Sequence, residues 1–455
     1  MKHIKRTAAF LLCAAIALSF SSCFSGKSIS EIEDSARSAL ESIYMPKIET
    51  PSLIKPDGNT DVGDFSSIDE INANSKNYTK LDITTGYDSL ENEAQRSLYK
   101  RMAIDVYIIG SNESDKGLYS VEKIYIDEPI SEKDIRVAMS AFKNDYPEIF
   151  WLSNRFSYVA GNTTEVQLYS VLSPSEIKTK SEKLITAITD LINQVPAGLS
   201  EFERELAIHD LLLGECFYND EVESTSEDWV PFSVYGAIVS GSAVCEGYSK
   251  AIQYLLSIFG IECNTISGTG NGNLHQWNVV KIDGKWYHLD ATWNDTTDDD
   301  IFYDYFNVSD EAISYDHEIA KLYSEMTSEE ICGTDDSGSD SQLFNLFVPE
   351  CCSDDANFYT RSSALFDGDN DASALGIEEK LQECITSGND TVYILVDSSL
   401  DYDEALNMLF YEPPYLFFKY IEKVNFSMGQ LINDEEVSVL KSERWSIFEV
   451  HIKFN

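Results

Sequence analysis

The dipeptide Asp283-Gly284 constrains the fold of this chain more than any other feature, because it links two strand-like runs. The runs extend over 275–282 and 285–290. Asp-Gly between two such runs is typical of a two-residue hairpin turn, since both residues tolerate the left-handed backbone conformation that the turn requires. The sequence therefore predicts an antiparallel β-hairpin over 275–290.

The register of this hairpin predicts which side chains share a face. A regular turn places Ile282 opposite Lys285, and counting outward from that pair places Trp277 opposite Asp290. His275 lies two residues before Trp277, on the same face, and is therefore a diagonal neighbour of Asp290. Such neighbours are roughly 7–8 Å apart at the backbone, within bridging distance of an imidazole and a carboxylate. A slip of one residue would move the two side chains to opposite faces.

Cys245 begins a predicted helix that ends at Gly260. Apolar residues recur at helical spacing along it: Tyr248, Ala251, Ile252, Leu255, Leu256 and Phe259. A thiol at the first residue lies at the positive end of the helix dipole, beside backbone N–H groups that lack intrahelical partners. Both features favour the nucleophilic thiolate, and the N–H groups could hold an oxyanion. On this feature alone, a small buried cysteine is the commoner interpretation.

Cys245, His275 and Asp290 together supply the groups that acyl transfer from an amide requires. The thiolate would attack the carbonyl carbon, the imidazole would move the proton, and the carboxylate would orient the imidazole and stabilise its charged form. The product would be a thioester, released by water or by an amine. These three residues are therefore the predicted catalytic triad.

Three motifs around these residues resemble the bacterial transglutaminase-like superfamily, and they occur in the order that this family uses. The motifs are VCEGYS at 244–249, HQWNVV at 275–280 and WYHLDATW at 286–293, with a looser match at 305–310. The resemblance implies an α+β, papain-like fold, in which a helix bearing the cysteine packs on an antiparallel sheet. It also implies a Cys-His-Asp triad at Cys245, His275 and Asp290. The family includes crosslinkers, peptidases and members without known activity, so the acceptor stays open.

Aromatic and histidine residues near the motifs have two interpretations. Tyr235 and Trp277 are candidate substrate-lining residues, although aromatic residues in such positions are more commonly part of the core. His288 is expected to be structural. His209, on a predicted helix over 202–213, is expected to be a packed helix residue rather than a catalyst.

The N-terminus has the pattern of an export signal. Basic residues precede an apolar run in residues 1–22, and small residues lead into Cys23, as at a lipoprotein processing site. We therefore expect Cys23 to be lipidated, residues 23–80 to form a tether, and the protein to be exported and anchored to the cell membrane facing outside. Ordinary signal cleavage without a lipid is the alternative.

The remaining chain divides into three predicted regions: an N-terminal α+β region at 81–195, the catalytic domain at 196–325 and a C-terminal α+β region at 326–455. The acidic segment 335–340 would link the last two. Strands are predicted at 118–126, 165–171, 262–267, 391–396 and 447–454. Helices are predicted at 132–142 and 175–192, with an apolar core segment at 147–152 and a Gly/Asn-rich loop at 268–273.

The charge of the chain excludes one class of partner. There are 33 basic and 78 acidic residues, for a net charge of −45. Such a chain would repel nucleic-acid phosphates, which argues against nucleic-acid binding, and contact with a membrane is expected only through the lipid. A peptide or protein substrate is the expected partner.

No metal cofactor is predicted. The nine cysteines include no CxxC pair, so a thiolate zinc site is unsupported. Asp367, Asp369, Asp371 and Glu378 match four positions of an EF-hand calcium loop, but Ala372 stands where glycine is expected. Calcium is therefore only a secondary possibility.

Two functions are compatible with the sequence. The favoured one is thiol-dependent acyl transfer or hydrolysis at amide bonds of peptides or proteins, through the Cys-His-Asp triad and a thioester. The alternative is a surface binding or scaffolding lipoprotein that keeps the fold without catalysis, which the large flanking regions suggest. The reactivity of Cys245 separates the two, because an activated thiolate titrates well below an ordinary thiol.

Overall fold

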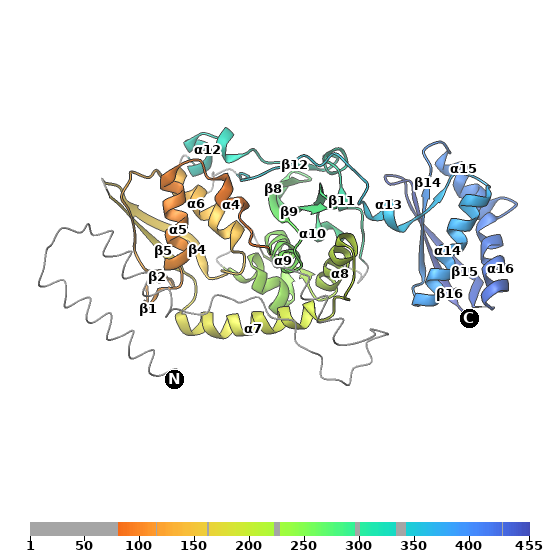
Figure 1. Ribbon diagram of the computed structural model, residues 1–455, viewed down its shortest axis with the longest axis horizontal. Coiled ribbons are helices and arrows are strands. Elements are labelled where there is room, and N and C mark those ends of the chain that lie inside the picture. The colour runs from red at the N-terminus through yellow and green to blue at the C-terminus, as the bar shows by residue number, and fades with distance from the viewer. Residues whose placement is uncertain are drawn as a thin grey trace, which may run out of the picture. The chain divides into compact units, whose positions relative to one another are not determined.

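The computed structural model describes residues 81–455 apart from 115, 162, 223–227, 296–300, 334–342 and 430. The predicted signal peptide, Cys23, the tether and the linker at 335–340 lie outside the described residues. The described chain forms two compact units: residues 81–283 with 316–349, and residues 284–315 with 350–455. Both combine helices with largely antiparallel sheets (Figure 1), so the predicted α+β class is confirmed. No helix in the described part of the chain is both long and apolar enough to cross a bilayer.

The first unit begins with a five-stranded sheet. Its strands are β1 (Ile109–Glu113), β2 (Tyr119–Val121), β3 (Ile124–Ile126), β4 (Leu152–Val159) and β5 (Thr164–Ser170). The single strand predicted at 118–126 is wrong, because β2 and β3 pair with different parts of β5 and the register shifts by one residue between them. The two residues in between leave the ladder, and the N–H of Glu122 instead donates to Ile108 O at 2.8 Å.

Helices α4 (Thr85–Ser89), α5 (Glu93–Asp105) and α6 (Glu132–Asp145) pack together beside this sheet (Figure 1). The predicted helices are confirmed as α6, α7 (Pro174–Ile192) and α8 (Glu201–Leu213). Each of these three starts at a serine whose side chain accepts from the N–H three residues later, while the acid at that later position bonds back. These capping boxes satisfy backbone donors at the helix start and fix where each helix begins.

The second half of the first unit holds a helix on a three-stranded antiparallel arrangement. Helix α9 (Cys245–Ile258) packs against β8 (Cys263–Gly270) and β9 (Asn273–Ile282), and β12 (His317–Ile319) pairs with the other edge of β8. The helix ends as predicted, because Gly260 has a left-handed backbone with φ of 77°. Smaller elements complete the unit: β6 (Phe217–Tyr218), β7 (Ser242–Ala243), α12 (Ser328–Cys332) and the single-turn helices Val230–Phe232, Gly236–Ser240 and Tyr323–Glu325.

The predicted loop at 268–273 is wrong. β8 continues to Gly270 and β9 starts at Asn273, so only Asn271 and Gly272 form the turn, with φ of 48° and 78°. Asn-Gly is a two-residue hairpin signal in its own right. Gly268 lies within β8, and it is a glycine because a Cβ there would come within 2.1 Å of Glu318 O on β12. The glycine therefore marks the close approach of a neighbouring strand.

The second unit contains β10 (Lys285–Leu289), which pairs with β11 (Phe306–Val308), and a four-stranded sheet. That sheet has the order β13 (Ala364–Phe366), β14 (Thr391–Val396), β16 (Ile447–Phe454) and β15 (Ile432–Ser442). Helices α14 (Asp371–Ser387) and α16 (Leu416–Met428) cover one face of it (Figure 1). The short helices are α10 (Ala291–Asn294), α11 (Asp310–Ile313), α13 (Phe358–Ser362), α15 (Tyr402–Leu406) and the single turn Asn407–Tyr411. The strands predicted at 391–396 and 447–454 are confirmed as β14 and β16.

The Asp283-Gly284 link is as short as the sequence predicts. β9 ends at Ile282 and β10 starts at Lys285, and the two residues between them have φ of 50° and 81°. Positive φ at both central residues is the signature of the turn type that Asp-Gly favours. The pairing of Trp277 with Asp290 stays a prediction.

Candidate active site

Cys245 is the first residue of α9 and is only partly buried. The helix starts there because Val244 is extended, and the carbonyl oxygen of Val244 accepts from the N–H groups of Gly247 at 2.9 Å and Tyr248 at 3.1 Å. Most of the helix beyond its first turn is buried. The thiol therefore lies at the positive end of a packed helix, beside the N–H groups of Cys245 and Glu246, which precede the first hydrogen bond of the helix.

Gly247, in the third position of the helix, allows another segment to approach the thiol-bearing turn. A Cβ at this position would lie 2.5 Å from Pro231 O and 2.8 Å from the Cβ of Ala243. The N–H of Val244 also donates to Pro231 O at 3.0 Å. Glycine in the VCEGYS motif is thus required by packing, since the segment around Pro231 lies directly against the helix start.

Helix α9 is tied to the strand that carries His275. The Nδ2 of Asn278, a buried residue on β9, donates to Ser249 O on α9 at 2.9 Å. Ser249 lies one turn beyond Cys245, and Asn278 lies three residues beyond His275. Within the first unit, the helix that begins with the cysteine therefore packs on the strand that bears the histidine, as predicted.

His275 lies in a cluster of buried rings. It faces Gly268 of β8 in the ladder and is 8% exposed. Its ring stacks on Trp277, with centroids 5.8 Å apart, and contacts the ring of His317 at 5.3 Å. These contacts restrict the orientation of the imidazole. The sequence offered no signal for His317, because β12 reaches β8 from a segment far along the chain.

Asp290 belongs to the second unit, where it is fully buried and caps α10. Its Oδ1 accepts from the N–H groups of Thr292 at 3.0 Å and Trp293 at 3.2 Å, and its own N–H donates to Tyr305 O at 3.0 Å. The aspartate of the motif DATW therefore has a local structural role, because its side chain accepts hydrogen bonds from the first N–H groups of helix α10. These bonds hold the carboxylate in one orientation.

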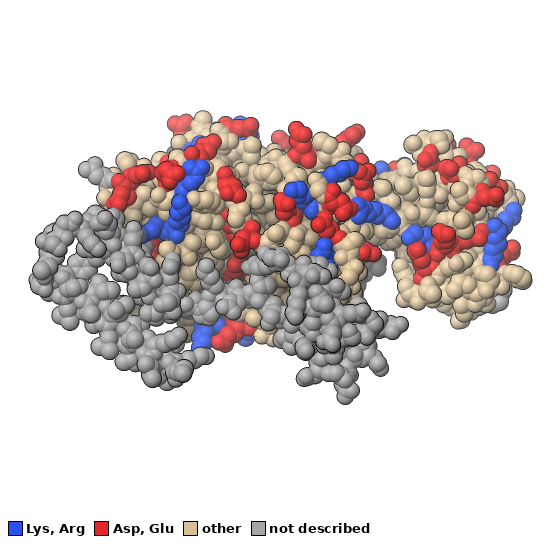
Figure 2. Space-filling view, in the orientation of Figure 1, with Lys and Arg blue, Asp and Glu red and all other residues tan. Residues whose placement is uncertain are grey.

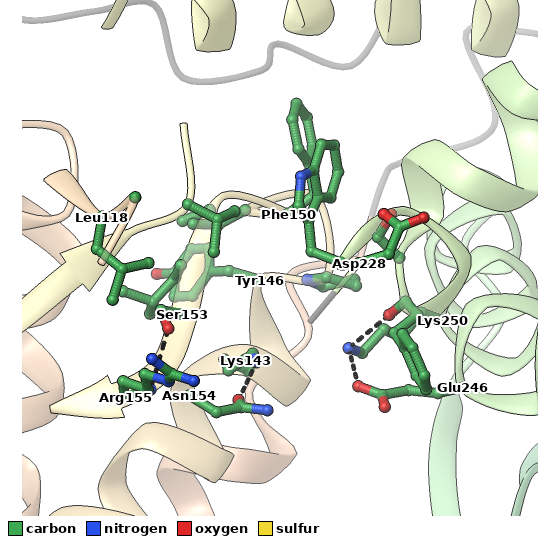
Figure 3. Close-up of a pocket in the computed structure, with 18 of the residues that line it drawn as sticks. Leu118, Lys143, Tyr146, Phe150, Ser153, Asn154, Arg155, Asp228, Glu246 and Lys250 are labelled. Carbon is green, nitrogen blue, oxygen red and sulfur yellow. Dashed lines mark hydrogen bonds and ion pairs between the residues drawn. The ribbon is translucent and has the colours of Figure 1, made fainter. Parts of the chain in front are cut away.

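A cavity of about 510 Å³ lies beside the start of α9 in the first unit (Figure 3). Glu246, the residue after the cysteine, lines it together with Lys250 from the next turn. Nζ of Lys250 bonds Glu246 Oε1 and donates to Phe232 O at 3.2 Å. On the facing wall, Lys143 of α6 bonds the side-chain oxygen of Asn154 on β4. The sequence did not reveal this cavity.

The charged side chains of the cavity shift the pKa values of one another. Burial and the nearby ammonium of Lys250 lower the pKa of Lys143 to about 8. Burial alone would raise the pKa of Glu246, but Lys250 and Lys143 outweigh that effect and hold the pKa below its usual value. Glu246 is therefore ionised at neutral pH, and Lys143 is charged at a cost in desolvation.

Comparison with known proteins identifies the family of this region. A model of the transglutaminase-like superfamily matches residues 190–291, which include Cys245, His275 and Asp290. This part of the chain is therefore similar to transglutaminase-like domains. The papain-like arrangement expected of such a domain, a cysteine-bearing helix packed on an antiparallel sheet, is confirmed in α9, β8 and β9.

Individual relatives share smaller parts of the chain. Kyphoscoliosis peptidase of Mus musculus is 26% identical over 134 residues, which cover 27% of this chain and 19% of that protein. The chain thus spans about a fifth of the length of this relative. Among solved structures, a TGase matches at 14% identity with a TM-score of 0.23, over 39% of this chain and 52% of that one. A proposed cysteine protease from Cytophaga hutchinsonii matches at 11% identity with a TM-score of 0.20, over 40% and 70%.

The seven cysteines that the structure describes differ in burial and in their position relative to helices. Four of them are buried: Cys216, Cys263, Cys351 and Cys384. Burial raises the pKa of the thiols of Cys263 and Cys351, so both stay protonated. Among the described cysteines, only Cys245 begins a long helix.

The two aromatic candidates for substrate contact occupy different places. Trp277 is 1% exposed and packs against both His275 and His317, so it belongs to the core around the imidazole. Tyr235 is also buried, and its ring contacts Phe150 at 5.3 Å and Trp229 at 5.8 Å. Both of those residues line the cavity, so Tyr235 supports the cavity wall from behind.

The histidines expected to be structural have clear partners. His209 is fully buried on α8, and its Nδ1 lies 2.9 Å from Asp210 Oδ1. In the second unit, His288 Nε2 lies 2.9 Å from Asp310 Oδ1, and Asp310 Oδ2 accepts from the N–H of Cys351 at 2.8 Å. His288, Asp310 and Cys351 could hold a metal ion by residue type, since their ligand atoms lie within 4.8 Å of one another. Asp310 uses both of its oxygens in these two hydrogen bonds.

The calcium-loop residues lie at the start of α14. The Oδ1 of Asn370 caps this helix by accepting from the N–H groups of Ala372 and Ser373, and Asp367 accepts from the side chains of Asn370 and Ser373. Glu378 lies within α14 and forms an ion pair with Lys423 at 2.8 Å. The structure thus uses these residues as a helix cap and an ion pair, and calcium stays the secondary alternative to the prediction of no cofactor.

Proposed function

We propose that the protein is a thiol-dependent enzyme that transfers or hydrolyses the acyl group of amide bonds in peptides or proteins. Cys245 is the nucleophile, His275 the base and Asp290 the group that orients the base. One observation carries the proposal: a partly exposed thiol begins the buried helix that packs on the strand of His275, inside the transglutaminase-like match.

The first half of the proposed reaction forms a thioester. The Cys245 thiol gives its proton to His275, and the sulfur attacks the carbonyl carbon of the amide. The carbonyl oxygen gains negative charge in the tetrahedral intermediate, and N–H groups at the start of α9 are suited to donate hydrogen bonds to it. The carbon–nitrogen bond then breaks, and the amine leaves with the proton from His275.

The second half returns the thiol. Water or an amine attacks the thioester carbon while His275 takes a proton from it, and the carbon–sulfur bond breaks. The proton then passes from His275 to the sulfur. The printed name of the mouse relative is that of a peptidase, which favours water and a peptide-bond substrate for this chain as well.

A mass-spectrometric assay tests the proposal directly. Glutamine-containing peptides are incubated with the full chain, with and without a primary amine, and the products are sorted into cleavage, deamidation and amine adducts. We expect products that depend on Cys245. The matched control is Cys352→Ala, which removes an exposed cysteine outside the match. If Cys245→Ala and the unchanged protein give the same products in all three channels, the proposal is wrong.

The alternative is a binding or scaffolding protein without catalysis, favoured by the size of the chain beyond residues 190–291. Alkylation by iodoacetamide as a function of pH separates the two. An enzyme requires Cys245 to react at neutral pH faster than the exposed Cys352, since thiolate is the reactive form. Equal rates that both rise only toward alkaline pH would favour the alternative.

The location that we propose is the outer face of the cell membrane, with the chain held by a lipid on Cys23. The basic and apolar pattern of residues 1–22 supports it. Partition of the expressed full chain into a detergent phase tests it, and Cys23→Ser is expected to move the protein to the aqueous phase. Equal partition of both proteins would contradict the anchor.

A further inference from the structure

The lining of the cavity beside α9 has more basic than acidic side chains, whereas the chain as a whole has more acidic than basic ones. The chain has 33 basic and 78 acidic residues, and acidic side chains are spread over the surface in Figure 2. The cavity lining instead has four basic side chains and two acidic ones. They are Lys116, Lys143, Arg155 and Lys250 against Asp228 and Glu246. In so acidic a protein, this is a place where an anion would be attracted.

The two lysines at the centre differ in their partners. The ammonium of Lys250 bonds the carboxylate of Glu246, which is one turn away on the same helix. The ammonium of Lys143 bonds a neutral group, the side-chain oxygen of Asn154. Figure 3 draws these two pairs on facing walls of the cavity. The side chains of Lys143, Lys250 and Glu246 together carry a net charge of about +1. This charge lies in a cavity wall that is partly shielded from water.

The rest of the wall is apolar and aromatic. Phe150 and Trp229 stack with centroids 5.4 Å apart and an angle of 17° between the rings. Pro147, Ile149 and Phe232 also line the cavity. A ligand here could place a carboxylate near Lys143 and its carbon stem against the rings. About 510 Å³ is within the range of small-ligand sites, enough for one or two residues of a peptide.

We infer that this cavity binds an acidic residue of the peptide substrate, with its carboxylate between Lys143 and Lys250 and a neighbouring apolar residue against Phe150 and Trp229. The inference rests on the proposed function, because it takes the bound peptide to be the substrate of Cys245. Glu246, which lines the cavity, is the residue that follows Cys245 in the sequence. It adds a specificity site for carboxylate-bearing peptides that the catalytic residues alone do not imply. Hydrogen bonds between ammonium and carboxylate groups are among the stronger polar contacts in proteins.

The protonation of Lys143 links this binding to pH. The groups that share the cavity with it are Tyr146, Arg155, Lys116, Asp228, Glu246 and Lys250. Its pKa is about 8, and a bound carboxylate would raise it, since an opposite charge favours the protonated form. Affinity should therefore be highest below pH 8 and fall as the pH rises above that value.

Calorimetric titration of the full chain tests the inference without catalysis. The protein carries Cys245→Ala, and the probes are acetyl-Phe-Glu-amide and its isosteric partner acetyl-Phe-Gln-amide. At pH 7 the glutamate probe should bind about tenfold more tightly than the glutamine probe. Lys143→Met should remove that preference. Lys183→Met, which changes an exposed lysine outside the cavity, should leave it within about twofold.

Equal affinity for the two probes, or no saturable binding of the glutamate probe, would overturn the inference. This comparison needs no substitution in the cavity, so it stands even if Lys143→Met folds poorly, and Lys143→Gln provides a second variant. Turnover of longer peptides without probe binding would overturn this site alone. Probe binding without any Cys245-dependent product would support this site and overturn the proposed function.

Discussion

Two helix-covered sheets in this molecule have very different interiors. In the second unit, α14 and α16 meet β13, β14, β16 and β15 around one cluster of apolar side chains, including Phe366, Phe417 and Phe448, and these helices bury only two polar residues, Ser373 and Asn425. In the first unit, α9 meets β8 and β9 around a mixture of apolar and polar groups. The buried polar members there are Ser249, Gln253, Ser257, Asn264, His275 and Asn278, and His317 of the neighbouring strand β12 is also buried.

The difference in buried polar residues shows that the two interiors have different roles. An apolar interior contributes free energy in proportion to the area that it hides from water. Buried polar groups stabilise little on balance, but they demand specific partners and so fix orientations. The first unit uses such groups to hold an imidazole and a thiol-bearing helix, whereas the second unit resembles a scaffold.

The largest effect is expected from Cys245→Ala. Loss of the nucleophile should lower the rate of product formation by at least about 10³-fold, as loss of a nucleophile does in other triads. The temperature of unfolding should hardly change, because the side chain is partly exposed and the substitution removes one sulfur. Product analysis and a thermal melt on the same sample measure the two effects. A large fall in stability with activity retained would assign Cys245 to the core.

The substitution Asp290→Asn distinguishes the negative charge of this side chain from its role as the cap of α10. Asparagine caps a helix about as well as aspartate, so α10 should persist and the melting temperature should stay close to that of the unchanged protein. Removal of the negative charge should still lower the rate by about 10²–10⁴-fold if the carboxylate stabilises an imidazolium. Asp290→Ala, the control, should lose the rate and also about 1 kcal/mol of stability. Unchanged turnover in Asp290→Asn would remove Asp290 from the triad.

Glycine substitutions sharpen the contrast between the two sheets. Gly247→Ala should lower stability by about 1–3 kcal/mol, because the new Cβ would lie 2.5 Å from Pro231 O. Gly376→Ala, in the middle of α14, meets nothing closer than 4.0 Å and should raise stability by about 0.5–1 kcal/mol. Denaturant unfolding measures both. Opposite signs are expected, and equal signs would contradict the packing difference.

The effect expected from Lys143→Met is as small as that of Gly376→Ala at neutral pH, and it disappears at high pH. The pKa of Lys143 is about 8 in the folded protein against an ordinary 10.5, so the folded state binds fewer protons between these values. The penalty for the charged lysine is therefore full below pH 8 and disappears as the pH rises to about 10.5. Lys143→Met should be more stable than the unchanged protein by about 1 kcal/mol at pH 7 and equal to it near pH 10.5. Lys183→Met should show no such pH dependence.

The sequence predicted best where one local pattern decides the structure. The residues of β14 and β16 alternate between buried and less buried positions, and both strands were predicted with their observed ends. The helix that begins at Cys245 and ends before Gly260 was predicted for the same reason, since apolar spacing and a terminal glycine coincide.

The sequence failed where distant segments meet. Residues 268–273 read as a loop because glycine is frequent there, but Gly268 is a strand residue that makes room for β12. Lys143 and Lys250 line one cavity from α6 and α9, and nothing in the sequence pairs them. The local spacing of Glu246 and Lys250 fits an i,i+4 ion pair, which was the available clue to this site.

The short strand β12 limits how a peptide can reach this domain. Both edges of β8 are occupied, by β9 on one side and by β12 on the other, so its backbone groups are not available to a visiting chain. Within the first unit, the outer edge of this arrangement is β12, which has only three residues. A substrate that docked as an additional strand would find a very short template there. Within this arrangement, the proposed peptide substrate would then be recognised mainly through its side chains.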